Sequence, residues 1–215
     1  MKNMVFIAVQ GAGKGTVAQK LQERHNLVHI SMGDLLRERR QIDDEIGNII
    51  ASTQDIGEFT PDNIIYQVIE ERLSQPDCER GYILDGFPRT LEQAKECEAI
   101  ANRLNKPVNL VINLTVPEEA LIERITSRRS CGKCNKIYSL SFEKMKPVVA
   151  GKCDACNSEL VFRNDDKDVD AIRKRIELYH TNAKSLIDFY NDLGKLVEVD
   201  ATETIPAVLE IEKLL

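Results

Sequence analysis

The sequence predicts an α/β fold: a doubly wound, five-stranded parallel sheet with helices on both faces, a helical insert and a small β-rich segment. Three observations carry this prediction. Short apolar runs alternate with amphipathic helical patterns along most of the 215 residues. A glycine-rich turn joins the first apolar run to the first helical pattern. Residues 129–163 break the alternation, because cysteines, prolines, glycines and short β-like pieces gather there. A chain of this length suits one core with inserts.

The predicted strands are short. They cover residues 4–9, 28–30, 81–84, 108–114 and 195–199. The first of them, Met4-Val-Phe-Ile-Ala-Val9, is a continuous apolar run, as a strand buried on both faces requires. Because helical segments separate the strands, a parallel sheet with crossover helices is the expected topology.

Helical patterns fill the intervals between the strands. They cover residues 14–24, 32–53 (more than one helix), 60–73, 91–104, 117 onward into the arginines, 169–190 and 205–215. Thr60-Pro-Asp-Asn63 has the composition of a helix start, with proline at the first helical position. Apolar residues recur at three- and four-residue steps from Val169 to Tyr190, which predicts one long amphipathic helix.

Composition and charge argue against several classes of protein. The net charge is -6, so the chain is a poor candidate for general nucleic-acid binding. No apolar stretch approaches the roughly 20 residues of a membrane helix, and no signal peptide is recognisable, so we expect a cytoplasmic protein without a membrane partner. Basic residues nevertheless cluster, which indicates a focused anion site; the alternative is a set of solvated helix faces. The cluster comprises Arg124, Arg128, Arg129, Arg163, Arg173, Lys174 and Arg175.

Two cysteine pairs lie in the segment that breaks the alternation. Cys131-Gly-Lys-Cys134 and Cys153-Asp-Ala-Cys156 have the spacing of a tetrathiolate metal site. In a reducing cytoplasm such pairs act as metal ligands and not as disulfides. Four thiolates leave no open position on zinc, so the predicted role is structural. An iron centre and a nucleic-acid zinc ribbon use similar spacing and stay open as alternatives. Cys78 and Cys97 lie outside the pattern.

The turn after the first strand is a candidate phosphate-binding loop. Gly11, Gly13 and Gly15 allow a tight turn whose N–H groups point at an anion, and the following helix adds its positive end. Lys14 can reach the terminal phosphates, and Thr16 is a candidate near magnesium. The pattern departs from the strict Walker form, so an ordinary strand-to-helix turn remains the alternative.

The second motif, Asp85-Gly-Phe-Pro-Arg89, directly follows the third predicted strand. Ligands of open α/β sheets bind at the carboxyl ends of the strands, so Asp85 and Arg89 are expected near Lys14. Asp85 can order water on magnesium, and Arg89 can bind a phosphate in a bidentate manner. The alternative is a tight Asp-Gly turn that proline terminates.

Together these motifs make the chain resemble adenylate kinase in its long-lid, zinc-bearing bacterial form. The resemblance rests on GAGKGT at 11–16, Ser31-Met-Gly-Asp-Leu-Leu-Arg37, DGFPRTLEQ at 85–93 and the arginine-flanked cysteine insert, and it extends from Val5 to about Val208. It implies a P-loop core (residues 1–30, 61–128 and 164–215), a nucleoside monophosphate (NMP)-binding insert (31–60) and a zinc lid (129–163). The implied reaction is reversible, Mg-dependent transfer, ATP + AMP = 2 ADP. No oligomerisation signal is recognisable in the sequence, so a monomer is expected.

The resemblance also implies roles for individual residues. The implied ATP-binding residues are Gly11, Ala12, Gly13, Lys14, Gly15, Thr16, Arg124, Arg128, Ile137, Tyr138 and Glu203. The implied AMP-binding residues are Met32, Arg37, Glu58, Phe59, Thr60, Gly86, Phe87, Pro88, Arg89, Gln93, Arg163 and Arg175. The implied catalytic residues are Lys14, Asp85, Arg89, Arg128, Arg163 and Arg175. Gln93 is expected to read the adenine edge.

The chain departs from the family pattern at several positions. Met32 replaces a threonine of the AMP pocket, Gln10 replaces a proline of the phosphate loop, and Ser139 stands where a histidine often follows the tyrosine. Two other functions therefore remain: a kinase for another monophosphate, and a weakly active nucleotide-sensing or zinc-ribbon protein. No general base is needed, because an AMP phosphate oxygen is already nucleophilic near neutral pH. The three histidines are accordingly interpreted as structural or surface residues.

Overall fold

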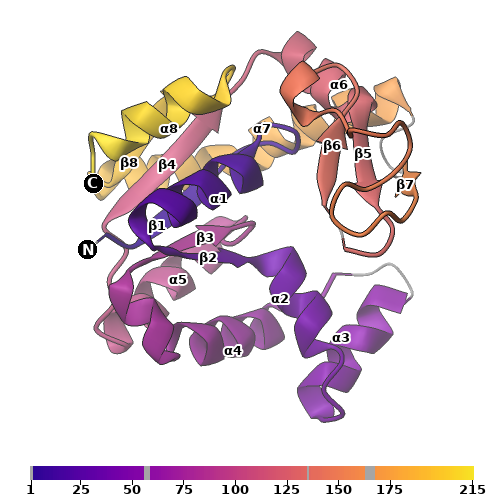
Figure 1. The fold of residues 1–215 in the computed structure, drawn as a ribbon. Coiled ribbons are helices and arrows are strands. Elements are labelled where there is room, and N and C mark those ends of the chain that lie inside the picture. Colours follow the sequence, from indigo (N-terminus) through magenta and orange to yellow (C-terminus); the bar gives the residue numbers. More distant parts are fainter. Residues whose placement is uncertain (1, 56–58, 135, 163–167) are drawn as a thin grey trace. The chain divides into compact units, whose positions relative to one another are not determined.

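The computed structural model describes residues 2–55, 59–134, 136–162 and 168–215, and its chain divides into two compact units (Figure 1). The sheet unit comprises Met1–Ala8, Gly13–Thr115 and Asn182–Leu215, and the cysteine unit comprises Val9–Ala12 and Val116–Thr181. Each unit is described by itself below.

The sheet unit contains the predicted five-stranded parallel sheet. Its strands are β1 (Met4–Ile7), β2 (Val28–Ser31), β3 (Tyr82–Asp85), β4 (Leu110–Thr115) and β8 (Leu196–Asp200). They pair in the order β2-β3-β1-β4-β8, and every pairing is parallel. All four residues of β1 are buried, as the continuous apolar run predicts for a strand covered on both faces. The predicted fold class is confirmed.

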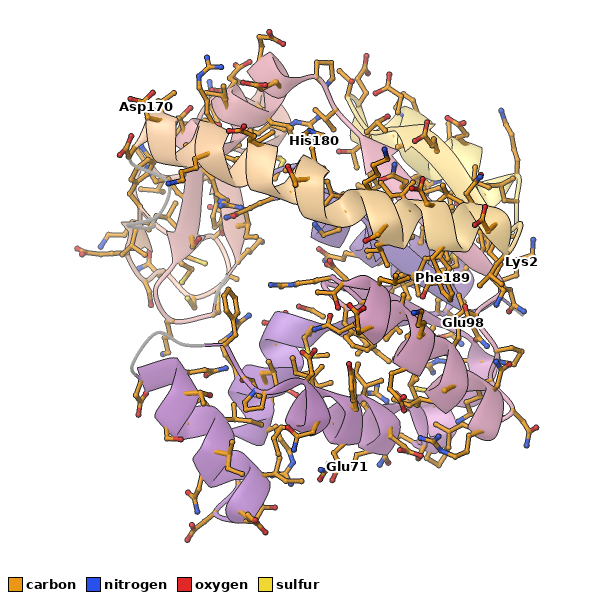
Figure 2. The ribbon with its side chains drawn as sticks, turned by 180° about the vertical axis from the view of Figure 1, so that it is seen from behind. Lys2, Glu71, Glu98, Asp170, His180 and Phe189 are labelled. Carbon is orange, nitrogen blue, oxygen red and sulfur yellow. The ribbon has the colours of Figure 1, made fainter. Side chains whose placement is uncertain are left out.

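Helices cover both faces of this sheet. The helical elements of the sheet unit are α1 (Lys14–His25), α2 (Met32–Arg39), α3 (Glu45–Asp55), α4 (Asp62–Leu73), α5 (Leu91–Arg103), α8 (Thr204–Glu212), the later residues of α7 (Val169–Asp192) and the 3-10 turn η1 (Pro76–Arg80). Of these, α3 packs on α2 and α4 and not on the sheet. Helix α1 packs against α8 on the face seen in Figure 1. Figure 2 shows the opposite face, where Glu98 of α5 pairs with Lys195 at 2.6 Å.

The predicted helical insert shares a small apolar core with α4, the helix that follows it. Buried Ile50 of α3 packs with Ile64 and Val68 of α4, and partly buried residues of α2 and α3 complete the cluster. The second helix of the insert, α3, begins directly after Asp44, whose carboxylate accepts the Gly47 N–H at 2.8 Å as an N-cap residue does. The sequence predicts Pro61 as the first residue of a helix, whereas α4 begins one residue later, at Asp62, and Pro61 is its N-cap.

The cysteine unit combines helices with a second, smaller sheet. Its elements are α6 (Glu118–Ser127), β5 (Arg128–Cys131), β6 (Ile137–Ser139), the 3-10 turn η2 (Glu143–Met145), β7 (Leu160–Val161) and the first part of α7. Strand β5 pairs antiparallel with both β6 and β7. The core of this sheet consists of Cys131, Tyr138 and Cys153, with Cys156 and Leu160 packed against it. A core this small needs support from something other than apolar burial.

Candidate active site

The glycine-rich turn after β1 leads directly into α1. Gly11 and Gly13 have φ values of 91° and 88°, a region in which other residues are strained, so glycine is needed at both positions. A side chain at Gly11 would also lie 2.7 Å from Ile125 of α6. Gly13 caps α1, and Lys14 is its first residue. The Lys14 ammonium donates to the Ala8 carbonyl at 2.8 Å, which holds this side chain against the turn.

Asp85 lies at the carboxyl end of β3, beside the start of α1. A side chain built at Gly15 would meet its Oδ2 at 3.6 Å, so the Asp-Gly motif and the glycine-rich turn share one edge of the sheet. Oδ2 also lies 3.3 Å from Nε2 of His29 on the neighbouring strand β2. The sequence does not indicate that His29 belongs to this site, because the pairing of β2 with β3 is not visible in it.

Residues 86–89 form a compact turn beside the start of α2. Arg89 donates through Nε to the Gly86 carbonyl at 2.8 Å, and Gly86 has a φ of 85°. A side chain at Gly86 would lie 3.7 Å from Cβ of Met32, so these two residues are neighbours. Met32 is only 4% exposed, and Phe87 is also buried. The neighbourhood of Gly86 is therefore apolar on the side that Met32 occupies.

Gln93 connects this turn to α4. Its Oε1 accepts the Arg89 backbone N–H at 2.8 Å, and its Nε2 donates to Oδ1 of Asp62 at 2.7 Å. Its own N–H donates to the Thr90 hydroxyl that caps α5. Gln93 is 7% exposed, so its amide is held by protein partners more than by water. The sequence motif predicts Gln93 as a site residue but does not indicate Asp62, which precedes Gln93 by 31 positions.

Arg37 lies on α2, on the exposed side of the insert. Its guanidinium pairs with Asp34 one turn earlier, and both side chains are about half exposed. Burial is the largest single effect on the pKa of Asp34 and would raise it, but the hydrogen bonds from Arg37 and Ser31 and the nearby positive charge together outweigh it, so the pKa is lowered. Phe59 is 88% exposed, whereas Thr60 is buried.

Some predicted residues lie outside the described part of the chain. Glu58 and Arg163 fall in its gaps, and the side chain of Arg175 is also outside the description. The structure thus brings together Lys14 with its loop and, separately, Met32, Gly86, Arg89 and Gln93.

The cysteine unit carries two of the predicted ATP-binding arginines. Arg124 on α6 donates to the Ala12 carbonyl at 3.3 Å and lies over the Phe142 ring at 5.7 Å. Arg128 is the first residue of β5. Of the two predicted residues on β6, Ile137 is 46% exposed, whereas Tyr138 is buried. Glu203, in the sheet unit, precedes α8, and its carbonyl accepts the Ala207 N–H at 3.2 Å.

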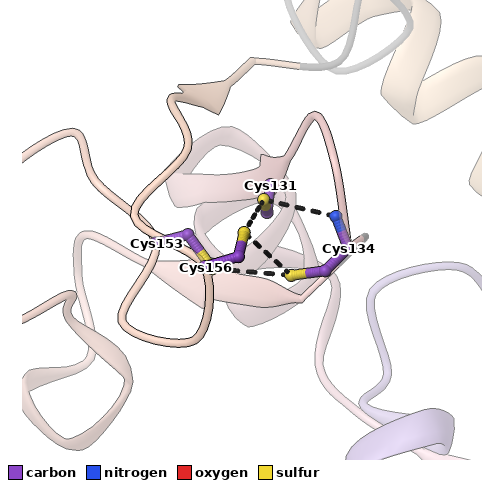
Figure 3. A group of neighbouring side chains, drawn as sticks. All are labelled: Cys131, Cys134, Cys153 and Cys156. Atoms are coloured by element: carbon purple, nitrogen blue, oxygen red, sulfur yellow. Dashed lines mark hydrogen bonds between the residues drawn. The ribbon is translucent and has the colours of Figure 1, made fainter.

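The four cysteines form a candidate metal centre, shown in Figure 3. Their sulfurs all lie within 4.8 Å of one another, and three pairs are separated by 3.4, 3.5 and 3.6 Å. A tetrahedron of thiolates at 2.3 Å from zinc has edges of about 3.8 Å, so the residues fit this metal. The backbone N–H groups of Lys133 and Cys134 both point at the Cys131 sulfur, as they do at a bound thiolate.

The surroundings of the sulfurs favour thiolates at two positions. The Tyr138 hydroxyl donates to the Cys153 sulfur at 3.3 Å and is the main cause that lowers the pKa of Cys153 to about 6. Hydrogen bonds from Ser158 lower the pKa of Cys156. A hydrogen bond from the Lys136 backbone also lowers the pKa of Cys134, but the neighbouring sulfurs outweigh it and raise that pKa to about 12. A divalent cation would remove this competition between the sulfurs.

Comparison with known proteins agrees with the geometry. The family model described as adenylate kinase matches residues 6–195. An adenylate kinase of Archaeoglobus fulgidus is 44% identical over 214 residues, which is 99% of this chain and 97% of the relative. The enzyme of that name from Thermodesulfovibrio yellowstonii is 41% identical over 95% of this chain and 94% of the relative. The chain belongs to the adenylate kinase family.

Adenylate kinases are phosphotransferases that act on nucleoside monophosphates, and this chain has that function. A third relative, from Thermotoga maritima, is 40% identical over 100% of this chain and 97% of its own length. The similarity therefore includes the cysteine segment as well as the sheet. Within the described residues, no helix is long and apolar enough to cross a membrane.

Proposed function

We propose that this adenylate kinase catalyses reversible transfer of a phosphoryl group, ATP + AMP = 2 ADP, by a direct in-line step. The observation that supports it most is the common sheet edge shared by the glycine-rich turn and Asp85, with the Arg89–Gln93 cluster on the turn that follows Asp85. Such an arrangement can hold two nucleotides with their phosphates facing each other.

The ATP phosphates are assigned to the glycine-rich turn. The N–H groups of residues 11–16 and the positive end of α1 would bind the β- and γ-phosphates. Lys14 would exchange its bond to the Ala8 carbonyl for a phosphate oxygen. Arg124 and Arg128 would add positive charge from the cysteine unit, with Ile137, Tyr138 and the Glu203 carbonyl near the nucleotide.

Magnesium, when bound with ATP, neutralises charge on the transferring phosphoryl group. The residues present fit such an ion through Asp85, a carboxylate beside the phosphate loop, and the hydroxyl of Thr16. Asp85 would orient water around the ion. His29, at 3.3 Å from Asp85, would help to fix the carboxylate.

AMP is assigned to the residues around Gly86. Arg37 and Arg89 would bind its phosphate, and Arg163 and Arg175 would bridge toward the transferring group. The base would lie among Met32, the backbone of residues 58–60 and residues 86–88, with its edge on Gln93. Catalysis then consists of positioning and charge neutralisation, for which no general base is required.

The two inserts are assigned to binding and closure. Residues 31–60 would form the AMP-binding insert and residues 129–163 a lid that excludes water from ATP, on a core of residues 1–30, 61–128 and 164–215. Cys131, Cys134, Cys153 and Cys156 would hold a structural zinc ion. Four thiol ligands fit a reducing compartment, which supports a cytoplasmic location. A monomer is proposed because no oligomerisation signal is recognisable in the sequence.

The experiment compares AMP, CMP, UMP and GMP as acceptors with MgATP, measured as nucleoside diphosphate formed. The expected result is a strong preference for AMP. A preference for another monophosphate would contradict the assigned base contact, and its cause would be sought at Met32, the apolar neighbour of Gly86. Nucleotide binding without transfer to any acceptor would contradict the proposed reaction.

A further inference from the structure

This inference rests on the proposed function, in which Gln93 contacts the base of the acceptor nucleotide. A glutamine amide donates hydrogen bonds through its Nε2 and accepts them at its Oε1. A rotation of the amide by a half-turn exchanges the positions of these two atoms. The orientation of the amide therefore decides which base edge it can bind. In this chain both ends of the Gln93 amide already have partners of fixed character.

The first partner is the Arg89 backbone N–H, which can only donate. It lies 2.8 Å from Oε1 of Gln93. The second is the Asp62 carboxylate, whose Oδ1 accepts from Nε2 at 2.7 Å. A rotated amide would place its NH2 group against the Arg89 N–H and its oxygen against the carboxylate. Because Gln93 is only 7% exposed, water could not readily relieve either conflict.

Asp62 is itself held in place at the start of α4, where a carboxylate is favoured by the helix dipole. Tyr66, one turn later on α4, stacks edge-on against Phe87 with ring centroids 6.3 Å apart. The pKa of Tyr66 is raised by burial first and then by the charge of Asp62. The carboxylate is therefore part of a cluster that joins α4 to the turn at residues 86–89.

The fixed amide keeps one N–H and one oxygen lone pair for a ligand. The 6-amino edge of adenine presents an acceptor at N1 and a donor at N6, which this amide can bind with two hydrogen bonds. The 6-oxo edge of hypoxanthine or guanine presents a donor at N1 and an acceptor at O6, which is the reverse pattern. A purine of the second kind could pair only with the rotated amide.

We propose that Asp62 is a positioning residue that fixes the orientation of the Gln93 amide and so makes the enzyme select 6-amino over 6-oxo purine monophosphates. Asp62 acts on selectivity through Gln93, without contact to the phosphoryl group that is transferred.

The test measures kcat/KM for AMP and for IMP, with MgATP, in the wild type, Asp62→Ala and Asp62→Asn. IMP is the sharpest probe, because its base differs from adenine only along the edge in question. We expect the AMP/IMP ratio to fall roughly tenfold or more in Asp62→Ala, the factor that follows from losing one hydrogen bond to a charged group. Asp62→Asn should show a smaller fall, because its amide oxygen can still accept from Gln93.

Glu70→Gln is the matched control. Glu70 joins the same two helices, α4 and α5, through two contacts of 2.9 Å to Arg103, far from the Gln93 amide. Glu70→Gln should change only the melting temperature, and its ratio of kcat/KM for AMP to that for IMP should equal the wild-type ratio. If Asp62→Ala does not fold, Asp62→Asn carries the test alone.

Two failures can be told apart. An unchanged AMP/IMP ratio in the folded Asp62 variants, or an equal change in Glu70→Gln, would overturn the role of Asp62 while leaving the kinase reaction intact. A wild-type protein that transfers no phosphoryl group to AMP would contradict the proposed function itself.

Discussion

Replacing Cys131 by serine tests the structural role of the four-cysteine centre. Cys131 is 1% exposed, and its sulfur accepts two backbone N–H groups and lies 3.4 Å from the Cys156 sulfur. Structural zinc sites of four ligands bind with about 10–16 kcal/mol, so one thiolate accounts for roughly 3 kcal/mol. In a chain of 215 residues, each kcal/mol shifts the melting temperature by about 2–4 °C. The expected loss is therefore about 6–12 °C.

The assay is thermal unfolding with and without a strong chelator, together with the metal content of the purified protein. The wild type should contain about one zinc ion per chain and should lose stability on chelation, whereas Cys131→Ser, which binds zinc more weakly, should lose less on chelation than the wild type. Cys97→Ser is the control, because Cys97 is a fully buried thiol outside the centre. Cys97→Ser should lose the same stability with and without the chelator, so its loss and the loss caused by chelation should be additive.

A metal-free wild type with an unchanged melting temperature would refute the structural role of the four-cysteine centre. An equal response of Cys131→Ser and the wild type to the chelator would refute it as well. At low temperature, where the variant is folded, its initial rate should stay near that of the wild type even though its melting temperature is lower. The reason is that the centre is assigned no part in the chemical step.

Three other predictions concern single side chains. Lys14→Ala should lower kcat by about 10²-fold or more with an unchanged circular dichroism spectrum, while Lys20→Ala on the same helix should not; near-normal turnover would refute the role of Lys14. Met32→Thr should lower the KM for AMP several-fold by supplying a hydroxyl beside Gly86, and an unchanged KM would leave this departure without consequence. Asp77→Asn should destabilise at neutral pH, because the hydrogen bond from Arg72 lowers the pKa of Asp77 below 3.8. The stabilisation by the Arg72–Asp77 pair is fully present above pH 3.8 and is lost as the pH falls through the lower pKa of Asp77 in the folded state. The free energies of unfolding of variant and wild type, measured in urea, should therefore become equal in acid. A difference in unfolding free energy that persisted in acid would contradict the ion pair.

The sequence predicts those features that depend on nearby residues. Three such features are the apolar run of β1, the glycines at 11 and 13 and the spacing of the four cysteines. The fold class and the cysteine cluster were predicted from them. Contacts between distant segments depend on strand order. Because β2 and β3 are neighbours, His29 meets Asp85, and because α4 and α5 start side by side, Asp62 meets Gln93. Neither pairing has a signal in the spacing of the residues.

The apolar character of a residue does not by itself predict whether its side chain is buried. Tyr138 and Ile137 are adjacent on β6, yet Tyr138 turns into the cysteine cluster and Ile137 stays 46% exposed. The alternation of a strand explains the difference once the register with β5 is known. The sequence could not supply that register, because three residues leave it undetermined.

The most direct test of the central claim supplies the protein with MgADP as its sole nucleotide. An adenylate kinase disproportionates ADP, so ATP and AMP should appear at equal initial rates, and Lys14→Ala should suppress both. Release of AMP or inorganic phosphate without ATP would indicate hydrolysis and would contradict phosphoryl transfer between two bound nucleotides. So would the absence of any product from a folded, metal-loaded protein.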